Sequence, residues 1–313
     1  MSWRKIQKQN FKHLRDLSAF LKVELKETGS FPLNLPKRLA EKMPKGTLDD
    51  PLTRQFVPLP DPPKDPLGFS KDPVQDSSFC KSDKLLQKYE GRALLLTTSA
   101  CAMHCRYCFR QNFPYAPKTQ YQEELALIAK DTSLQEVILS GGDPLSLADR
   151  DLKALLTSLD QMAHIQLIRF HTRFPIGIPE RIDESFLSIL AECKTQTVFL
   201  IHANHARELD ADVLSALKKV QHNGIPVLIQ TVLLKGVNDS IEALKELFLT
   251  CVTAGIIPYY LHGLDRVEGA AHFEVDPETG RALIHALRSQ LPGYAVPRYV
   301  QEIPGKTEKT LLV

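Results

Sequence analysis

The chain has 313 residues, of which 43% are hydrophobic and 24% charged, enough for one large domain with a buried core, with or without an appendage. Its net charge of +2 favours binding to neither nucleic acids nor anionic membranes. The N-terminus lacks the apolar run of a signal peptide, no stretch is long enough to span a membrane, and the six cysteines do not resemble a disulfide framework. We therefore expect a cytoplasmic protein.

The N-terminal quarter of the chain is predicted to be helical. Apolar residues recur at helical spacing between residues 5 and 25, and residues 35–43 are predicted to form a second short helix. Six prolines between residues 58 and 73 favour an extended connector, because proline cannot donate a backbone hydrogen bond. We expect a helical appendage with its connector over residues 1–75, a main domain over 76–290 and a C-terminal tail over 291–313.

Six short aliphatic runs follow the connector and alternate with amphipathic segments. The runs cover residues 93–98, 136–142, 165–172, 197–204, 226–234 and 257–265. Alternating strands and helices indicate an α/β fold with a parallel sheet covered by helices. Six units are too few for a closed eight-unit barrel, so we expect an open or partial (β/α)6 barrel, with a doubly wound sheet as the alternative.

Polar or unusual residues come directly after the ends of five of these runs. Three cysteines follow the first run, "SGGD" the second, "HTR" the third, "HANH" the fourth and "HGLD" the sixth. Ligands of parallel α/β proteins bind at the carboxyl ends of the strands. We therefore expect these residues to face one site.

The cysteines Cys101, Cys105 and Cys108 predict a metal centre. Structural zinc usually takes four protein ligands in two separated pairs, and His104, inside the trio, would make a cramped fourth ligand. Closely spaced thiolates instead hold iron–sulfur clusters, and three ligands leave one iron of a four-iron cluster open. A [4Fe-4S] cluster with an open iron is therefore the favoured interpretation, and zinc or three incidental cysteines are the alternatives.

The stretch "CAMHCRYC" resembles the Cys-x3-Cys-x-aromatic-Cys signature of radical S-adenosylmethionine (radical SAM) enzymes, with Tyr107 in the aromatic position. The resemblance implies a partial (β/α)6 radical-SAM barrel. It also implies S-adenosylmethionine on the open iron and reductive cleavage by an electron donor such as flavodoxin. In "SGGDPL" the glycines allow close approach to a ligand, and the resemblance implies that Gly141, Gly142 and Asp143 contact the methionine amino group.

Stretches from about residue 47 to the end also resemble the lysine 2,3-aminomutase family, notably "KYEGRALLLTTSACAMHCRYCFRQNFPY", "PYYLHGLDRVEGAAHF" and "EIPGKTEKT". The resemblance implies pyridoxal 5′-phosphate as a further cofactor, carried on a lysine near the C-terminus. Lys309 is the expected lysine, because Glu302 seven residues before it and a threonine after it fit the family pattern. Lys306 also precedes a threonine but has Tyr299 at the acidic position.

The resemblance assigns the remaining cofactor contacts as well. It implies that Lys88, Tyr89 and Arg92 hold the pyridoxal phosphate group, although lysine at position 88 is a point charge where arginine is usual. It further implies that His202 and Gln230 contact S-adenosylmethionine.

For the substrate, the resemblance implies two binding ends for L-lysine. Arg110 corresponds to the arginine that binds the amino-acid carboxylate, and Asp265 to an aspartate that binds the ε-ammonium. Glu302 replaces a second aspartate and is one methylene longer. An acidic pair suits a cationic side chain and disfavours a glutamate substrate.

Two features of the sequence differ from the free-lysine mutases and indicate the subfamily. The sequence ends four residues after Lys309, and Ser240 stands where the free-lysine mutases have a zinc-binding cysteine. The chain therefore resembles the subfamily that makes (R)-β-lysine, which a lysyl ligase attaches to elongation factor P. A metabolic free-lysine 2,3-aminomutase, a radical enzyme for another amino acid and a non-catalytic metal-binding module are the alternatives.

Overall fold

The computed structural model describes residues 2–26, 32–59, 65–116 and 120–313, and its central element is one nine-stranded open sheet. The strands, in their order across the sheet, are β1 (Leu85–Tyr89), β2 (Arg92–Thr98), β3 (Glu136–Gly141), β4 (Leu167–Thr172), β5 (Gln196–His202), β6 (Val227–Val232), β7 (Ile257–His262), β8 (Arg298–Gln301) and β9 (Thr310–Leu311). Strands β2 to β8 are parallel, and β1 and β9 are antiparallel to their neighbours.

The order of the strands identifies the architecture. It follows the order of the chain without a reversal, whereas a doubly wound sheet reverses direction at a switch point. The doubly wound alternative is therefore wrong, and the partial-barrel prediction is confirmed. The six predicted strands correspond to β2–β7, while β1, β8 and β9 were not predicted.

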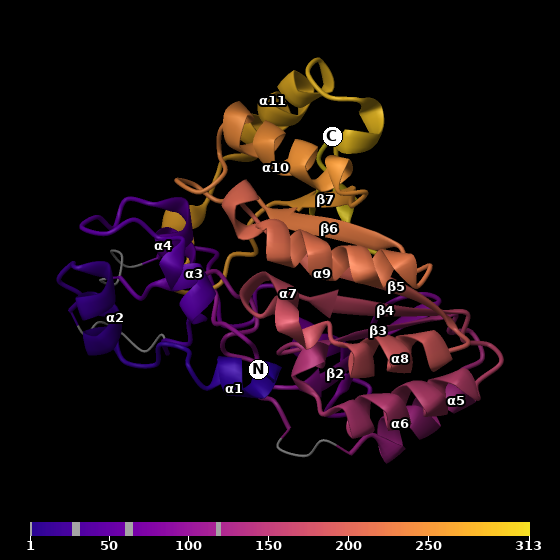
Figure 1. Cartoon of the computed structure of the whole chain (residues 1–313). Helices are drawn as coiled ribbons and strands as arrows, with labels where there is room; N and C mark the ends of the chain where they lie inside the picture. The colour runs from indigo at the N-terminus through magenta and orange to yellow at the C-terminus, as the bar shows by residue number, and fades with distance from the viewer. Residues whose placement is uncertain (1, 27–31, 60–64, 117–119) are drawn as a thin grey trace.

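The helices that follow the strands pack on the outer face of the sheet (Figure 1). They are α5 (Gln122–Lys130), α6 (Asp149–Asp160), α8 (Glu184–Glu192), α9 (Ala211–His222), α10 (Ile241–Thr253) and α11 (Pro277–Arg288). Four of them begin at side chains that accept backbone N–H bonds, namely Asp183, Asp210, Ser240 and Asp276, and such caps define where a helix starts. Ser240, where the resemblance implies a cysteine in the free-lysine mutases, thus caps α10.

The strands alternate between core and cavity. In β4, Ile168 and Phe170 are fully buried in the apolar core, whereas Arg169 and His171 line a cavity inside the partial barrel. This alternation follows from the two-residue period of a strand. β4 therefore adds polar side chains to a cavity that apolar residues such as Leu94 and Ile138 also line.

The N-terminal region differs in detail from the prediction. One helix over residues 5–25 is wrong, because Phe11 pairs with Leu35 in an antiparallel bridge and separates α1 (Trp3–Gln7) from α2 (Leu14–Leu21). The short helices α3 (Lys37–Glu41) and α4 (Pro51–Phe56) follow. Apolar residues of all four helices belong to the same core as the barrel.

Residues 60–64 of the proline-rich connector lie outside the described residues, and the division into 1–75, 76–290 and 291–313 stays a prediction. Short helical turns complete the fold: η1 (Asp76–Phe79), η2 (Pro144–Ser146), α7 (Phe174–Gly177), η3 (Pro179–Arg181), η4 (Ala206–Glu208), η5 (Ala271–Phe273) and η6 (Gly293–Ala295). None of the described helices has the length and apolar character needed to cross a membrane.

Candidate active site

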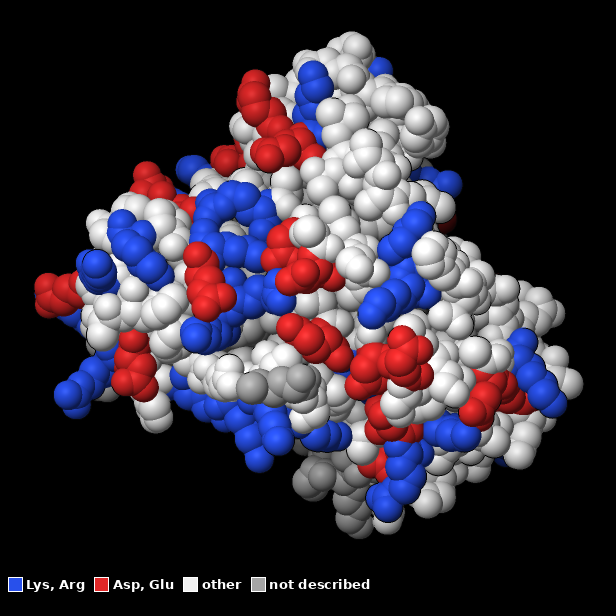
Figure 2. All heavy atoms as spheres, in the orientation of Figure 1, with Lys and Arg blue, Asp and Glu red and all other residues white. Residues whose placement is uncertain are grey.

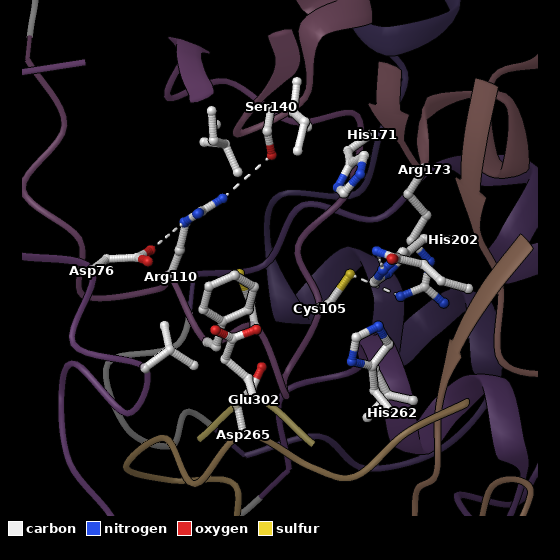
Figure 3. Close-up of a pocket in the computed structure, with 18 of the residues that line it drawn as sticks. Asp76, Cys105, Arg110, Ser140, His171, Arg173, His202, His262, Asp265 and Glu302 are labelled. Atoms are coloured by element: carbon white, nitrogen blue, oxygen red, sulfur yellow. Dashed lines mark hydrogen bonds and ion pairs between the residues drawn. The ribbon is translucent and has the colours of Figure 1, made fainter. Parts of the chain in front are cut away.

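A cavity of about 610 Å³ lies inside the partial barrel, and side chains from several strands and loops point into it (Figure 3). All the residues predicted for the site line this cavity: Lys88, Tyr89, Arg92, Cys101, Cys105, Tyr107, Cys108, Arg110, Gly141, Gly142, Asp143, His202, Gln230, Asp265, Glu302 and Lys309. The fold thus brings together residues that are more than 200 positions apart in the sequence. Their individual roles stay predictions.

The three cysteines lie in the loop between β2 and α5, and each is partly buried. Burial raises the pKa of all three thiols, that of Cys108 to about 11. Metal ligation requires thiolates, so a metal that binds here releases protons.

The three thiols share one loop, as closely spaced ligands of an iron–sulfur cluster do. Among the described residues, no three His, Cys, Asp or Glu side chains are placed to hold one metal ion. A tetrahedral zinc site would need its ligands around one position. In a four-iron cluster, each thiolate instead binds its own iron, so three spaced thiols in one loop suit a [4Fe-4S] cluster.

The N-terminal region holds the cysteine loop through hydrogen bonds. The Asn10 side chain donates to the carbonyl of Ala102 at 2.8 Å, and the backbone carbonyl of Gln55 accepts from the amide of Arg106 at 2.9 Å. Both groups satisfy polar atoms of an irregular loop, which lacks strand or helix partners of its own. The sequence offered no motif for these contacts.

A buried polar network around Arg173 also contacts Cys105, the second of the three cysteines. Arg173 donates from Nη1 to Sγ of Cys105 at 3.0 Å and from Nη2 to Glu208 at 2.6 Å and to the Gln55 side chain at 2.8 Å. It also contacts the hydroxyl of Tyr107. Because a buried guanidinium stays charged, Glu208 supplies the anion that it needs. The prediction from sequence missed this arginine, although it lies within "HTR".

The glycines at the end of β3 are required by contact with the cysteine loop. A Cβ atom on Gly142 would lie 2.4 Å from the carbonyl oxygen of Ala100, and one on Gly141 would lie 2.6 Å from that of Thr98. Gly141 also has a φ of +118°, which favours glycine. The backbone of the glycine stretch therefore packs directly on the loop that carries the cysteines.

Asp143 anchors this turn within the protein. Its carboxylate accepts hydrogen bonds from the Thr172 hydroxyl at 2.8 Å, the Arg173 amide at 2.8 Å and the Leu145 amide at 3.0 Å. Burial raises the pKa of Asp143 to about 6, although these hydrogen bonds oppose the shift. The aspartate thus shapes the glycine turn, and its predicted contact to a methionine amino group is a separate role.

The predicted carboxylate-binding arginine is held by an aspartate that the sequence did not reveal. Nε of Arg110 lies 2.7 Å from Asp76, and Nζ of Lys88 lies 2.8 Å from the other oxygen of the same carboxylate. Burial acts to raise the pKa of Asp76, but the charges of Arg110 and Lys88 hold it below its usual value. Asp76 lies at the boundary of the predicted connector, where no motif marks it.

The predicted cofactor lysine forms an ion pair with the glutamate seven residues before it. Nζ of Lys309 lies 2.6 Å from Glu302, whose second oxygen accepts a hydrogen bond from the Tyr89 hydroxyl at 2.6 Å. Burial acts to raise the pKa of Glu302, but Lys309, Tyr89 and Lys88 hold it below its usual value. A carboxylate thus faces the cavity beside Lys309.

Asp265, the second predicted acid, lies near this pair. Burial raises its pKa to about 7, and the charge of Lys309 opposes the shift. Its Oδ1 is buried and has no hydrogen-bond partner among the described residues. Asp265 and Glu302 point into the same part of the cavity (Figure 3), so an additional cation would stabilise both.

Cationic side chains from three strands supply a possible site for a phosphate. Arg92, Arg169 and Arg298 line the cavity, and buried Nε atoms of the first two have no hydrogen-bond partner in the described chain. Nη2 of Arg169 is, however, paired with Glu136 at 2.7 Å. Guanidinium groups bind phosphate well. The residues present therefore fit pyridoxal phosphate, although Lys88, expected to help hold it, is paired with Asp76.

Histidines line the cavity between these groups. His202 contacts the side chain of Gln230, its neighbour across β5 and β6. Burial lowers the pKa of His202 to about 3 and lowers those of His171 and His262 well below the usual value. All three are therefore neutral at physiological pH and add no charge to the cavity.

Comparisons with known proteins identify the family. A model of the radical SAM superfamily matches residues 95–248, which include the three cysteines. The chain is 42% identical to an L-lysine 2,3-aminomutase of Escherichia coli K12 over 90% of this chain and 83% of that protein. The chain belongs to the lysine 2,3-aminomutase family. It is also 40% identical to the Haemophilus influenzae L-lysine 2,3-aminomutase over 90% of this chain and 84% of that protein.

Membership makes the protein an isomerase of the radical SAM class. The Bacillus subtilis L-lysine 2,3-aminomutase is 33% identical over 91% of this chain but only 61% of its own length. A radical SAM methyltransferase from Sphaerobacter thermophilus shares the fold, with a TM-score of 0.51 at 17% identity over 69% of this chain and 68% of that chain. A [4Fe-4S] cluster and S-adenosylmethionine are the cofactors that the radical SAM class implies.

Proposed function

We propose that the protein is an L-lysine 2,3-aminomutase that uses pyridoxal 5′-phosphate on Lys309 and converts (S)-α-lysine to (R)-β-lysine. The observation that carries the proposal is the convergence of three elements in one cavity: the cysteine trio, Arg110, and the acidic group Asp265–Glu302 beside Lys309. When bound, pyridoxal phosphate would supply an aldehyde that can hold the amino group of the substrate and a conjugated π-system that stabilises a radical while the nitrogen migrates.

The residues of the chain bind and orient the substrate. Arg110, fixed by Asp76, binds the carboxylate of lysine, and Asp265 and Glu302 receive its ε-ammonium. Charges at both ends hold the β-carbon in one orientation, which is the main contribution that a protein makes to a reaction carried by cofactors. Arg92, with Tyr89 beside it, binds the cofactor phosphate.

The remaining predicted cofactor contacts surround the cysteines. Gly141, Gly142 and Asp143 bind the methionine end of S-adenosylmethionine, and Tyr107, His202 and Gln230 complete its site. The close packing of the glycine stretch on the cysteine loop supports this assignment, since both elements line the same cavity.

We further propose that the product is destined for elongation factor P, through a lysyl ligase, and that a flavodoxin-type donor reduces the cluster in the cytoplasm. Identities of 42% and 40% with the E. coli and H. influenzae relatives, against 33% with the B. subtilis one, support a grouping with the first two. The capping role of Ser240, in place of a zinc-binding cysteine, agrees with it.

An anaerobic turnover assay tests the reaction. Cluster-reconstituted protein receives L-lysine, pyridoxal phosphate, S-adenosylmethionine and dithionite, and the products are separated by chiral chromatography. We expect (R)-β-lysine from the wild type and from Lys306→Ala, and none from Lys309→Ala. Cleavage of S-adenosylmethionine without β-lysine would exclude lysine as substrate, and the absence of cleavage by a verified cluster would exclude radical chemistry.

The link to elongation factor P has its own test. Purified ligase and elongation factor P are incubated with either the product of this enzyme or α-lysine. The fraction of modified factor is then measured over time by mass spectrometry. We expect faster modification with the enzymatic product. Equal rates would place the enzyme in free-lysine metabolism.

A further inference from the structure

The ion pair between Lys309 and Glu302 resembles the contact that Glu302 is proposed to make with the ε-ammonium of the substrate. The proposed substrate is lysine, so the group that Glu302 would bind in the substrate is an ε-ammonium on a four-carbon chain. Lys309 presents the same group on the same chain, and its Nζ already lies 2.6 Å from Glu302. The side chain of Lys309 is therefore identical to the side chain of the substrate that Asp265 and Glu302 are proposed to bind.

We infer that, in the cofactor-free protein, Lys309 occupies the ε-ammonium site and excludes the substrate from it. This inference rests on the proposed function. Lys309 thereby has two uses: it carries the cofactor in the loaded enzyme and it blocks the substrate site in the empty one. The affinity for the substrate is then lower in the cofactor-free protein than after the cofactor is loaded.

The charges around the contact support this difference in affinity. Glu302 also accepts from Tyr89, and Lys88 lies 3.9 Å away, but Lys88 is closer to Asp76, at 2.8 Å. Lys309 is therefore the main counter-ion of Glu302. While it stays in place, a second ammonium gains little at Glu302, because like charges at one carboxylate repel each other.

Tethering makes the internal ammonium a strong competitor. Lys309 lies seven residues after Glu302 and directly before β9, which pairs with β8, the strand that ends directly before Glu302. A group held in this way has an effective concentration of about millimolar or more. Free lysine must exceed that value to displace it.

Attachment of the cofactor removes the competitor. Nζ forms a double bond to the aldehyde carbon, the carbonyl oxygen leaves as water, and protons of the ammonium pass to that water or to solvent. The nitrogen then carries at most one N–H in place of three. Glu302 loses its main donor, and with Asp265 it becomes free for the ammonium of the substrate.

The test measures binding of L-lysine to cofactor-free protein by isothermal titration calorimetry, with neither cluster nor S-adenosylmethionine needed. The variants are Lys309→Met, which keeps most of the side-chain volume but not the charge, and Lys306→Met as the matched control. Lys306 is exposed in the same tail and has no ion pair with the described residues. Circular dichroism and thermal unfolding verify that each variant is folded.

We expect Lys309→Met to bind L-lysine about tenfold more tightly than the wild type, the effect of about 1.4 kcal/mol that one charged hydrogen bond supplies. Lys306→Met should match the wild type. In a Glu302→Gln background, Lys309→Met should bring no gain, because the site that it vacates has lost its charge. Affinities of Lys309→Met and wild type within twofold of each other would overturn the inference, and so would undetectable binding to every variant.

A parallel titration separates this outcome from a failure of the proposed function. Wild-type protein loaded with pyridoxal phosphate is titrated with L-lysine and followed by its cofactor absorbance. Tight binding here, with no difference between cofactor-free wild type and Lys309→Met, refutes the blocking role alone. No absorbance change on loading would refute the cofactor assignment itself.

Discussion

One carboxylate, that of Asp76, holds two cations of the cavity at once: Arg110 at 2.7 Å and Lys88 at 2.8 Å. Asp76 is almost fully buried, with a relative exposure of 2%. A buried carboxylate between two cations fixes both side chains and offsets their mutual repulsion. The end of the cavity that we propose to bind the substrate carboxylate therefore depends on a residue that need not touch the substrate.

Asp76→Asn should weaken substrate binding and stability together. Removal of one partner from a buried ion pair costs about 3–5 kcal/mol of unfolding free energy, and a loosened Arg110 should raise the KM for L-lysine by about tenfold or more. Urea denaturation and steady-state kinetics measure the two effects. The exposed Asp83→Asn, on the same segment, is the control. An unchanged KM would show that Arg110 keeps its position without Asp76.

Gly142→Ala should prevent normal cluster assembly. The new methyl carbon would lie 2.4 Å from the carbonyl oxygen of Ala100 and 2.6 Å from the carbonyl carbon of Ser99, so the cysteine loop must move. We expect fewer irons per chain after reconstitution and a cost of about 1–3 kcal/mol in stability. Iron analysis and cluster absorbance measure this. Gly293→Ala, where no atom lies within 4 Å of the added carbon, should retain full iron; an equal loss in both variants would contradict the steric explanation.

Asp265→Asn should change the pH dependence of stability. The pKa of Asp265 in the folded protein is about 7, above its usual value near 4. The unfolded chain therefore loses this proton first as pH rises, and the folded wild type is progressively destabilised between about pH 4 and pH 7. Asparagine does not titrate.

The free energy of unfolding of Asp265→Asn should thus rise relative to that of the wild type across this window. The gain is at most about 4 kcal/mol, since one pKa unit corresponds to about 1.4 kcal/mol. Urea denaturation at pH 5 and pH 8 measures the difference. A difference that stays constant between these two pH values would rule out a raised pKa for Asp265.

Glu208→Gln should destabilise the support of the cysteine loop. Glu208 is fully buried, accepts from Arg173 at 2.6 Å and also accepts from the amide of Asn204 at 2.9 Å. A neutral amide leaves the buried guanidinium uncompensated, which costs about 3–5 kcal/mol. Glu180→Gln, in an ion pair with Arg38 at the surface, should cost less than about 1 kcal/mol. Urea denaturation measures both variants. A similar loss of unfolding free energy in the two would show that burial of the Glu208–Arg173 pair does not increase its contribution to stability.

The sequence predicted the repeating part of the fold because its signal is local. The strands β2–β7 are continuous apolar runs, and the helices between them have one apolar face, so period and composition suffice. The site residues were predicted by their motifs and their position after strands. The cysteines were predicted in this way, whereas Arg110 and Lys309 were implied only by the resemblance to the lysine 2,3-aminomutase family; the structure places all of them on one cavity.

The features of the fold and of the site that the sequence did not predict depend on contacts between segments that are distant in the sequence. The helix predicted over residues 5–25 is interrupted because Phe11 pairs with Leu35, and β9 has only two residues, too few for a pattern. Asp76 and Arg173 have ordinary neighbours in the sequence, and only their partners make them important. A single sequence does not report such partners.

The nine strands do not form a closed ring of backbone hydrogen bonds: β1 and β9 are the two edges. Side chains bridge the gap, since Tyr89 at the end of β1 donates to Glu302, which follows β8, at 2.6 Å. A backbone ladder opens only when several hydrogen bonds break together, whereas a side-chain contact opens by rotation about a few single bonds. The two edges of the sheet are therefore joined at Tyr89 and Glu302 by a contact that can open while every strand stays paired.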